Sequence, residues 1–206
     1  MFDAEGKYDI TAFAVHAEFR KSDSLLRRPV YAIEEITERC SPETHDAFVA
    51  LTYRELNRTR TRLCAEMKGK GYRLATFVSP NAFVWRNVPV GENCFIFENN
   101  VVQPFCHIGS NVILWSGNHI GHHSVIEDNV FIASHVVVSG HCRIGRNSFV
   151  GVNATLADQV IIGPDNWIGP GTLITKDTAE GAMWRAESTA ISAVGAKRFF
   201  RVKSDD

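Results

Sequence analysis

The sequence predicts a mostly β protein, a left-handed parallel β-helix of hexapeptide repeats that follows a small N-terminal α/β domain. Three observations lead to this fold class. Aliphatic residues return at every sixth position for almost a hundred residues, charged residues become scarce after residue 77, and strand-like and helix-like segments alternate before it. With 206 residues, the chain is long enough for one good core and a smaller unit beside it.

The six-residue period begins at Val78. Stepping by six from there to Ile174, all seventeen positions hold Ile, Val or Leu. The residue four places after each is small, β-branched or Asn, and the residue directly after each is Gly at seven positions. Neither an α-helix, with about 3.6 residues per turn, nor an ordinary meander keeps such a phase, whereas a hexapeptide β-helix does.

Each six-residue unit is expected to form one flat side of a triangular coil. The aliphatic residue points inward, the small residue leaves room at the turn, and Gly relieves the corner backbone. Three units close one coil, so residues eighteen apart should stack with a spacing of about 4.8 Å. Cys94, Cys106 and Cys142 occupy the small inward position and are therefore expected to be packing residues.

Charge divides the chain into regions. Residues 1–77 carry 25 charged side chains, whereas residues 78–175 carry nine. Within the first region, alternating strands and helices predict a small α/β unit with a parallel sheet. Its strands are expected at residues 8–15, 47–51 and 72–78, and its main helix at residues 54–68. The expected domains are 1–77 for the α/β unit, 78–178 for the β-helix and 179–206 for a C-terminal extension.

Three stretches of the coil carry a family resemblance: residues 108–126 (IGSNVILWSGNHIGHHSVI), 131–140 (FIASHVVVSG) and 144–154 (IGRNSFVGVNA). They look like the sugar O-acyltransferase family, which includes NeuD-type sialic acid O-acetyltransferases and 4-amino-sugar N-acetyltransferases. The resemblance implies a homotrimer that moves an acetyl group from acetyl-CoA to an amino or hydroxyl group of a sugar. It also implies that acetyl-CoA lies between neighbouring coils, and that the sugar is nucleotide-linked and serves surface-polysaccharide biosynthesis.

Acetyl transfer needs a group that takes the proton of the attacking amine or hydroxyl, and a neutral imidazole suits this task. Five histidines lie close together in the coil: His119, His122, His123, His135 and His141. His122 matches the family's proton acceptor and is the expected base. The next residue, acidic in some members, is His123 here, and it is the second catalytic candidate. Either another group, Asn118 or Ser124, orients the base, or the chemistry differs in detail.

The resemblance also supplies candidates for contact with acetyl-CoA. Gly140 and Val152 match positions whose backbone contacts the acetyl-CoA arm. Phe131 occupies the position at which some members place a second His near the thioester. Asn118 opens the run of residues 118–123 that leads to the base, and it is the fourth candidate for cofactor binding.

Two rival functions remain open. A non-catalytic scaffold or interaction protein could keep the fold without the chemistry. A γ-type carbonic anhydrase needs three zinc-ligand histidines spaced around the coil and across subunits, and the clustering of His119, His122 and His123 in one turn region speaks against it. A metal site built from these three is not expected either, because adjacent histidines with no nearby carboxylate lack the usual ligand set.

An apolar column is expected on the outside of the coil. The residue before each inward aliphatic should point outward. In every third unit this residue is large and apolar: Phe77, Phe95, Ile113, Phe131, Phe149 and Trp167. Such a stripe is seldom left in water, so it is expected to form the trimer interface or the seat of the C-terminal segment. That segment carries four cations, Lys197, Arg198, Arg201 and Lys203, which either meet the CoA phosphates or stay in solvent.

Composition excludes several partners. A formal net charge of -1 gives no bulk attraction for nucleic acid or anionic lipid. No apolar run is long enough to span a membrane and the N-terminal residues show no signal-peptide core, so a cytoplasmic location is expected. Five cysteines without a CxxC pair agree with reduced thiols in that compartment.

The N-terminal unit is expected to be an incomplete nucleotide pocket. In the family, this unit usually opens with a strand and a Gly-rich turn that lets the backbone approach phosphate closely. Here no such turn precedes the strand at residues 8–15, and the acidic residue expected after that strand is His16. We expect weak binding of nucleotide sugars, with residues 1–7 loosely held or packed on a neighbouring subunit.

Overall fold

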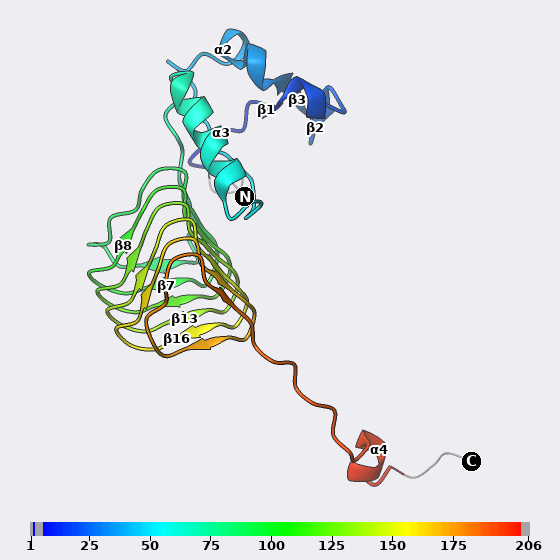
Figure 1. The fold of residues 1–206 in the computed structure, drawn as a ribbon. Helices are drawn as coiled ribbons and strands as arrows, with labels where there is room; N and C mark the ends of the chain where they lie inside the picture. Colours follow the sequence, from blue (N-terminus) through cyan, green and yellow to red (C-terminus); the bar gives the residue numbers. More distant parts are fainter. Residues whose placement is uncertain (1, 3–5, 203–206) are drawn as a thin grey trace.

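The chain consists of three parts that follow one another in sequence (Figure 1). The computed structural model describes residue 2 and residues 6–202. An N-terminal unit lies against a triangular coil, and a C-terminal segment runs away from the coil and ends in helix α4 (Ala196–Phe199). The expectation for residues 1–7 therefore falls largely outside the described residues, and the cation of Lys203 lies outside them.

The coil is built from three parallel sheets, one on each side of the triangle. Sheet 1 contains β4 (Phe77–Val78), β6 (Phe95–Ile96), β9 (Ile113–Leu114), β12 (Phe131–Ile132), β15 (Phe149–Val150), β18 (Trp167–Ile168) and β20 (Met183–Trp184). Sheet 2 contains β5 (Phe83–Val84), β7 (Val101–Val102), β10 (His119–Ile120), β13 (Val137–Val138), β16 (Thr155–Leu156) and β19 (Leu173–Ile174). Sheet 3 contains β8 (His107–Ile108), β11 (Val125–Ile126), β14 (Arg143–Ile144) and β17 (Ile161–Ile162). Up to β19, each strand pairs with residues eighteen positions away, as His119 pairs with Val101 and Val137.

The interior of the coil is filled by the aliphatic residues that the six-residue period predicts. From Ile96 to Ile174, every residue of this series is at most 2% exposed. Burying one such side chain contributes about 1.5–3 kcal/mol, so stability accumulates along the stack. Cys94, Cys106 and Cys142 are buried in the same core, which confirms that they are packing residues. The predicted β-helix is confirmed.

The corners of the coil turn through residues in the left-handed backbone conformation. Corner 3–1, between sheets 3 and 1, uses Asn93, Asn111, Asn129, Asn147 and Asp165. Asn is one of the few L-residues that adopt this conformation at low cost. The four Asn side chains form a ladder from coil to coil, with Nδ2 to Oδ1 distances of 2.9, 2.8 and 3.1 Å. Corner 2–3 uses Phe105, His123, His141 and Gln159, and corner 1–2 uses Asn99, Gly117, His135, Asn153 and Gly171.

The N-terminal unit has a small sheet with the order β1-β3-β2. Strand β1 (Phe13–Val15) runs parallel to β3 (Arg28–Ala32), and β2 (Ser24–Leu25) runs antiparallel to β3. Two 3₁₀ turns, η1 (Ala17–Phe19) and η2 (Ile33–Glu35), and the helices α2 (Ile36–Arg39) and α3 (Arg58–Gly69) complete it. Its own apolar core lies between η2, α2 and α3 and includes Ile33, Ile36, Cys64, Met67 and Tyr72.

Several sequence-based boundaries in this unit were wrong. The strand expected at residues 8–15 is limited to Phe13–Val15, and the strand expected at 47–51 is reduced to a single bridge between Ala47 and Leu74. The central strand β3 was not predicted, because it carries Arg28 and Pro29 and lacks clear alternation. The helix starts four residues later than expected, after a left-handed turn at residues 55–57, where φ lies between 47° and 67°.

The N-terminal unit docks on corner 3–1 and contacts the coils one by one. The pairs are Val49 with Asn93, Arg60 with Asn111, Asn57 with Asn147, and Arg58 with Asp165, at donor–acceptor distances of 2.8–3.0 Å. Each coil thus offers a polar corner group at a fixed height. The unit is held against the side of the stack rather than at its end, which leaves the other two corners uncovered by it.

Most of the outward apolar column on sheet 1 is covered by this same unit, which the sequence did not predict. Phe131 and Phe149 are 2% and 7% exposed, and the ring of Tyr53 lies 5.0 and 4.5 Å from theirs. Phe48 covers Phe95 in the same way, and Phe2 covers Phe77. The column is not the seat of the C-terminal segment, because residues of the N-terminal unit of the same chain fill the space in front of it, and a trimer interface on this side would form over Phe48 and Tyr53 rather than over the column itself.

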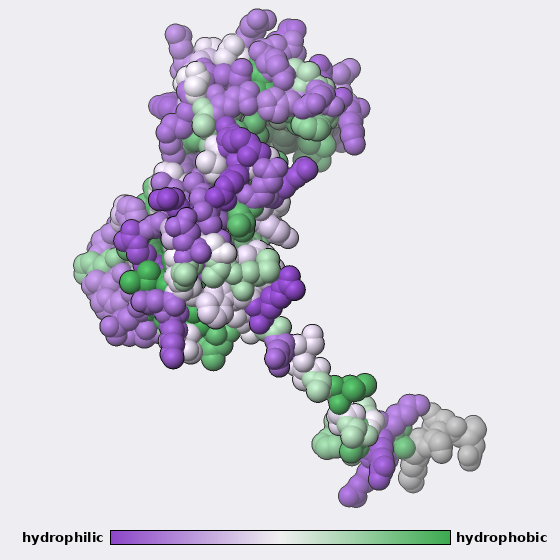
Figure 2. Space-filling model, in the orientation of Figure 1, coloured by the Kyte–Doolittle hydropathy of each residue, from purple (hydrophilic) through white to green (hydrophobic). Residues whose placement is uncertain are grey.

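The C-terminal segment makes few contacts with the rest of the chain. Beyond β20 its described residues are exposed, including Ile191, Phe199 and Phe200. Figure 2 shows both apolar and hydrophilic surface on this segment, which lies away from the largely hydrophilic surface of the N-terminal unit. Among the described residues, none of the helices is both long and apolar enough to cross a membrane.

Candidate active site

The histidines predicted to be catalytic lie at corner 2–3, away from the docked N-terminal unit. His122 is exposed, and its backbone N–H donates to Gln103 Oε1 of the preceding coil at 2.9 Å. Its ring lies beside Gly140 of the following coil. A Cβ on Gly140 would be 2.8 Å from His122 Cε1 and 3.0 Å from Nε2, so any larger residue there would require the imidazole to move. Asp158, one coil further on, approaches the same point to 3.1 Å.

His123 belongs to a stack of rings along the same corner. Phe105, His123 and His141 occupy equivalent left-handed positions in three successive coils. The ring centroids of Phe105 and His123 are 4.8 Å apart, as are those of His123 and His141, with interplanar angles of 27° and 15°. The coil spacing fixes this stack, because each corner residue repeats one strand separation from the last.

The two adjacent histidines contact each other directly. His122 Nδ1 and His123 Nδ1 are 3.1 Å apart. A hydrogen bond across this distance requires one Nδ1 to carry a proton and the other to accept it. When His122 is the donor, its Nε2 keeps a lone pair, and this atom and Cε1 border the space beside Gly140. In this tautomer the pair supplies an exposed proton acceptor at His122 Nε2.

Two residues proposed to orient the base do not reach it. Asn118 is 1% exposed and points into the prism, where its side chain bonds Trp115 O, Asn100 Oδ1 and the Val136 N–H. Ser124 is fully buried and donates to Ser139 O. Both side chains are bonded inside the corner turns, whereas the ring of His123 contacts that of His122.

Two of the expected cofactor contacts are also corrected by their burial. The Asn118 side chain is enclosed within the coil, so it has no surface to offer acetyl-CoA. Phe131 lies under Tyr53 in the column on sheet 1, on the side of the coil that the N-terminal unit covers. Neither side chain is available to a ligand at corner 2–3.

The other two expected contacts, Gly140 and Val152, lie at different corners. Gly140 is at corner 2–3 with His122, whereas Val152 is at corner 1–2 and is 42% exposed. These two corners bound the same face of the coil, which is sheet 2. The outward positions of that face hold four exposed apolar side chains, Phe83, Val101, Val137 and Leu173, with the half-buried His119 and Thr155 between them. One chain therefore places the two parts of the expected cofactor site at opposite edges of a largely apolar sheet.

The structure brings together a histidine that the sequence reasoning did not group with the pair. His141 lies over His123, whereas His119 is on strand β10 of sheet 2 and its backbone pairs with Val101 and Val137. Nitrogen atoms of His122, His123 and His141 all lie within 4.8 Å of one another. The signal for this grouping was present, because residues 123 and 141 are one coil of eighteen residues apart.

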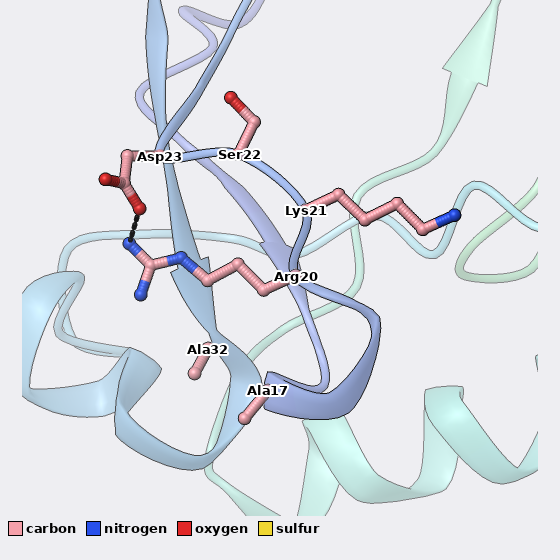
Figure 3. A pocket seen from close by; sticks show the side chains of 6 residues that line it. All are labelled: Ala17, Arg20, Lys21, Ser22, Asp23 and Ala32. Atoms are coloured by element: carbon pink, nitrogen blue, oxygen red, sulfur yellow. Dashed lines mark hydrogen bonds and ion pairs between the residues drawn. The ribbon is translucent and has the colours of Figure 1, made fainter.

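A separate hollow lies on the N-terminal unit (Figure 3). It has a volume of about 360 Å³ and is lined by Ala17, Arg20, Lys21, Ser22, Asp23 and Ala32. The guanidinium of Arg20 is paired with Asp23 at 2.9 Å. At the end of β1, the ring of His16 lies between Glu34 and Glu66, at 3.0 and 3.3 Å. These two carboxylates place negative charge next to the hollow.

Comparison with known proteins agrees with the fold. The coil matches the family Bacterial transferase hexapeptide (six repeats) at residues 87–122, 105–140 and 141–176. None of the curated proteins has a sequence that matches this chain. The predicted resemblance to the hexapeptide-repeat acyltransferases is confirmed.

Solved structures extend the similarity beyond the coil. The acetyltransferase domain of PglB from Neisseria gonorrhoeae FA1090 is 25% identical with a TM-score of 0.79, and 88% of this chain and 86% of that chain are covered. The same domain has been solved in complex with acetyl coenzyme A. PerB from Caulobacter crescentus, in complex with CoA and GDP-perosamine, shares the fold at 22% identity and a TM-score of 0.71, covering 78% and 77% of the two chains. WeeI from Acinetobacter baumannii AYE shares the fold at 21% identity and a TM-score of 0.65, and 84% of this chain and 81% of that chain are covered.

Proposed function

We propose that this protein transfers an acetyl group from acetyl-CoA to an amino or hydroxyl group of a sugar, with His122 as the general base. The observation that carries the proposal is the exposed His122 imidazole beside Gly140, in a chain that resembles an acetyltransferase domain solved with acetyl coenzyme A. The sugar acceptor is supported by PerB, whose complex contains GDP-perosamine. The expected role in surface-polysaccharide biosynthesis and the cytoplasmic location fit an enzyme that uses acetyl-CoA.

The chemistry follows from the tautomer of the histidine pair. The acceptor nitrogen or oxygen bonds to the thioester carbonyl carbon and gives its proton to His122 Nε2. The C–S bond then breaks, and the departing thiolate takes that proton from the imidazolium. While His122 is protonated, its Nδ1–H donates to His123 Nδ1 across 3.1 Å. His123 thus does what an acidic neighbour does in some family members, because it accepts a hydrogen bond from the imidazolium.

This mechanism is tested by three substitutions. His122→Asn should lower the catalysed rate by about 10²–10⁴-fold, the usual contribution of a general base, while acetyl-CoA affinity changes little. Gly140→Ala should displace the ring and lower the rate as well, because its Cβ would lie 2.8 Å from His122 Cε1. His107→Gln, an exposed histidine on sheet 3, is the control that should keep full activity.

The assay is a mass-spectrometric screen for acetyl transfer to amino sugars and nucleotide-linked sugars. If the His122 variant keeps most of the activity while a His123→Gln variant loses it, the base is His123. If the native protein acetylates none of the acceptors and does not bind acetyl-CoA, it is the non-catalytic scaffold instead.

We also propose that the active form is a homotrimer closed through sheet 2. Four of its six outward positions hold apolar side chains, Phe83, Val101, Val137 and Leu173, which are 37–65% exposed, and apolar surface of this extent is seldom left in water. When three copies turn their sheet 2 faces toward a common axis, corner 2–3 of one copy meets corner 1–2 of the next. Gly140 and His122 of one subunit would then face Val152 of its neighbour, which completes the acetyl-CoA groove that one chain leaves in two halves.

The assembly is tested with a matched pair of charge substitutions. Val137→Glu places a carboxylate in the proposed interface, whereas Ile161→Glu places one on sheet 3 at a similar exposure, 47% against 41%. Sedimentation velocity should show monomers for Val137→Glu and trimers for Ile161→Glu. A Val137→Glu protein that remains a trimer would remove sheet 2 from the interface.

The N-terminal unit is proposed to bind nucleotide sugars weakly, with a dissociation constant of about 1 mM or poorer. Glu34 and Glu66 hold His16 at the end of β1, and their carboxylates would repel a diphosphate there. Calorimetry with acetyl-CoA and with nucleotide-linked sugars separates the two ligands. Micromolar binding of a nucleotide sugar that a His16→Ala variant does not change would show that another surface holds it.

A further inference from the structure

Corner 2–3 carries three clustered histidines, whereas the proposed proton transfer uses only His122 and His123. His122, His123 and His141 are all exposed, and the mechanism above assigns no role to His141. One nitrogen of each ring lies within 4.8 Å of the others. The three side chains come from two successive coils, and the backbone bond from His141 N to His122 O, at 2.8 Å, fixes how the coils meet.

We infer that this three-histidine cluster binds a divalent transition-metal ion of the zinc class. Neutral imidazole nitrogen is a preferred ligand of Zn²⁺, and three protein ligands with one open position form a common site. Two nitrogens on a tetrahedral Zn²⁺ lie about 3.3 Å apart for bonds of about 2.0–2.1 Å. The measured distance from His122 Nδ1 to His123 Nδ1, 3.1 Å, is close to that value.

The third ligand requires one local adjustment. A metal ion lies in the plane of each imidazole that binds it, and the rings of His123 and His141 are stacked at 15°. One of them must therefore rotate about its Cβ–Cγ bond. Both side chains are exposed and leave the backbone at equivalent corner positions, with φ of 61° and 55°, so the rotation meets no buried group. The rigid coils keep the three Cα atoms in place while it happens.

The charge around the cluster favours a cation. Asp158 approaches the space beside Gly140, which is the space that the His122 ring occupies. Its other oxygen accepts a hydrogen bond from Gln159, at 2.9 Å, which holds the carboxylate at the corner. The sequence reasoning rejected a metal site because it grouped His119 with the pair and saw no carboxylate. The structure replaces His119 with His141 and adds Asp158.

Metal binding would switch off acetyl transfer, a consequence that rests on the proposed function. The ion takes the lone pairs of His122 and His123, so the base can no longer accept the proton of the acceptor amine or hydroxyl. Because His141 neither accepts nor donates a proton in the proposed transfer, it is the residue that separates the two activities. Replacing it should abolish inhibition by zinc and leave catalysis in place.

The test is calorimetric titration of the full-length, untagged and metal-free protein with ZnCl₂. The native protein should bind one ion per chain at micromolar concentration, and His141→Asn should weaken binding by about 10-fold or more, equivalent to about 1.4 kcal/mol. Asn suits the left-handed corner, as Asn129 and Asn147 show at corner 3–1. His107→Gln, an exposed histidine outside the cluster, should bind zinc as the native protein does.

Two results would overturn the inference: no binding of zinc by the native protein at micromolar concentration, or equal binding by His141→Asn. Acetyl transfer measured with and without zinc forms the second arm, in which the native enzyme should be inhibited and His141→Asn should be active and resistant. If the native protein binds zinc through His141 but transfers no acetyl group without it, the metal site stands and the proposed function fails.

Discussion

The guanidinium of Arg60 joins the N-terminal unit to the coil. Its removal should destabilise the N-terminal unit and leave the stability of the coil unchanged. Arg60 is fully buried on helix α3. Its Nε and Nη2 donate to Oδ1 and O of Asn111 at 2.8 and 3.0 Å, and its Nη1 donates to Thr52 O and Asn57 Oδ1 at 2.9 and 3.1 Å. Burial lowers the pKa of Arg60 to about 10, so the side chain is still charged at neutral pH. All of these acceptors are neutral oxygens.

The magnitude comes from two opposing contributions. A pKa lowered from 12.5 to about 10 corresponds to roughly 3 kcal/mol of unfavourable charge burial. Four hydrogen bonds from a charged donor contribute about 1.5–3 kcal/mol each, so together they exceed that cost. Arg60→Met also leaves Asn57 Oδ1 buried without its donor and frees the left-handed turn at residues 55–57. We expect Arg60→Met to destabilise the N-terminal unit by about 3 kcal/mol or more.

Hydrogen exchange followed by mass spectrometry is the assay. Amides of α3 should exchange about a hundredfold faster in Arg60→Met, the factor that roughly 3 kcal/mol gives, while amides of β6 to β18 keep their protection. Arg62→Met, two residues further along α3, is the control, because Arg62 and its partner Glu55 are exposed and such pairs contribute less than about 1 kcal/mol. Equal exchange of α3 in the two variants would refute the reasoning.

Two further predictions concern the buried side chains. Phe149→Glu should lower the free energy of unfolding by about 3–5 kcal/mol, because Phe149 packs on Tyr53 and Phe131 within the chain. Urea denaturation measures this change, with Ile161→Glu as the control. A Phe149→Glu protein that has native stability but sediments as a monomer would instead place sheet 1 in the subunit interface. All five thiols should fail to react with Ellman's reagent at pH 8 until the protein is denatured, because burial raises the pKa of Cys94 to about 12 and of Cys64 to about 11 and keeps both neutral. One rapidly reacting thiol in the native protein would contradict this.

The coil was predictable because a single physical rule acts on each of its residues. An aliphatic side chain at every sixth position has one arrangement that buries all of them, so Val78 to Ile174 specify the strands and their register together. The same rule places Cys94, Cys106 and Cys142 inside and His122 outside. His122 was identified by its match to the family's proton acceptor and not by this rule, and its role as the base stays a prediction.

The N-terminal unit was less predictable because its key contacts are made to the coil and not within its own sequence. Arg60 lies in a run of alternating Arg and Thr residues that reads as a solvated helix face, yet it is fully buried against Asn111. Tyr53 covers the outward column from a segment with no periodic pattern. Such contacts join residues about fifty to ninety positions apart, where neither propensity nor spacing carries a signal.

The three corners of the coil differ in a way that relates backbone conformation to function. All three turn through left-handed residues, for which Asn and Gly have the lowest conformational cost. Corner 3–1 uses Asn in four successive coils and is covered by the N-terminal unit. Corner 2–3 instead uses Phe105, His123, His141 and Gln159 in the same conformation, at a cost of order 1 kcal/mol or more for each residue. Stability alone would not select rings there when Asn serves the same turn at lower cost. The stacked imidazoles are better explained by what they hold outside the coil, because His123 contacts His122 and, as we propose, His123 and His141 bind a metal ion together with His122.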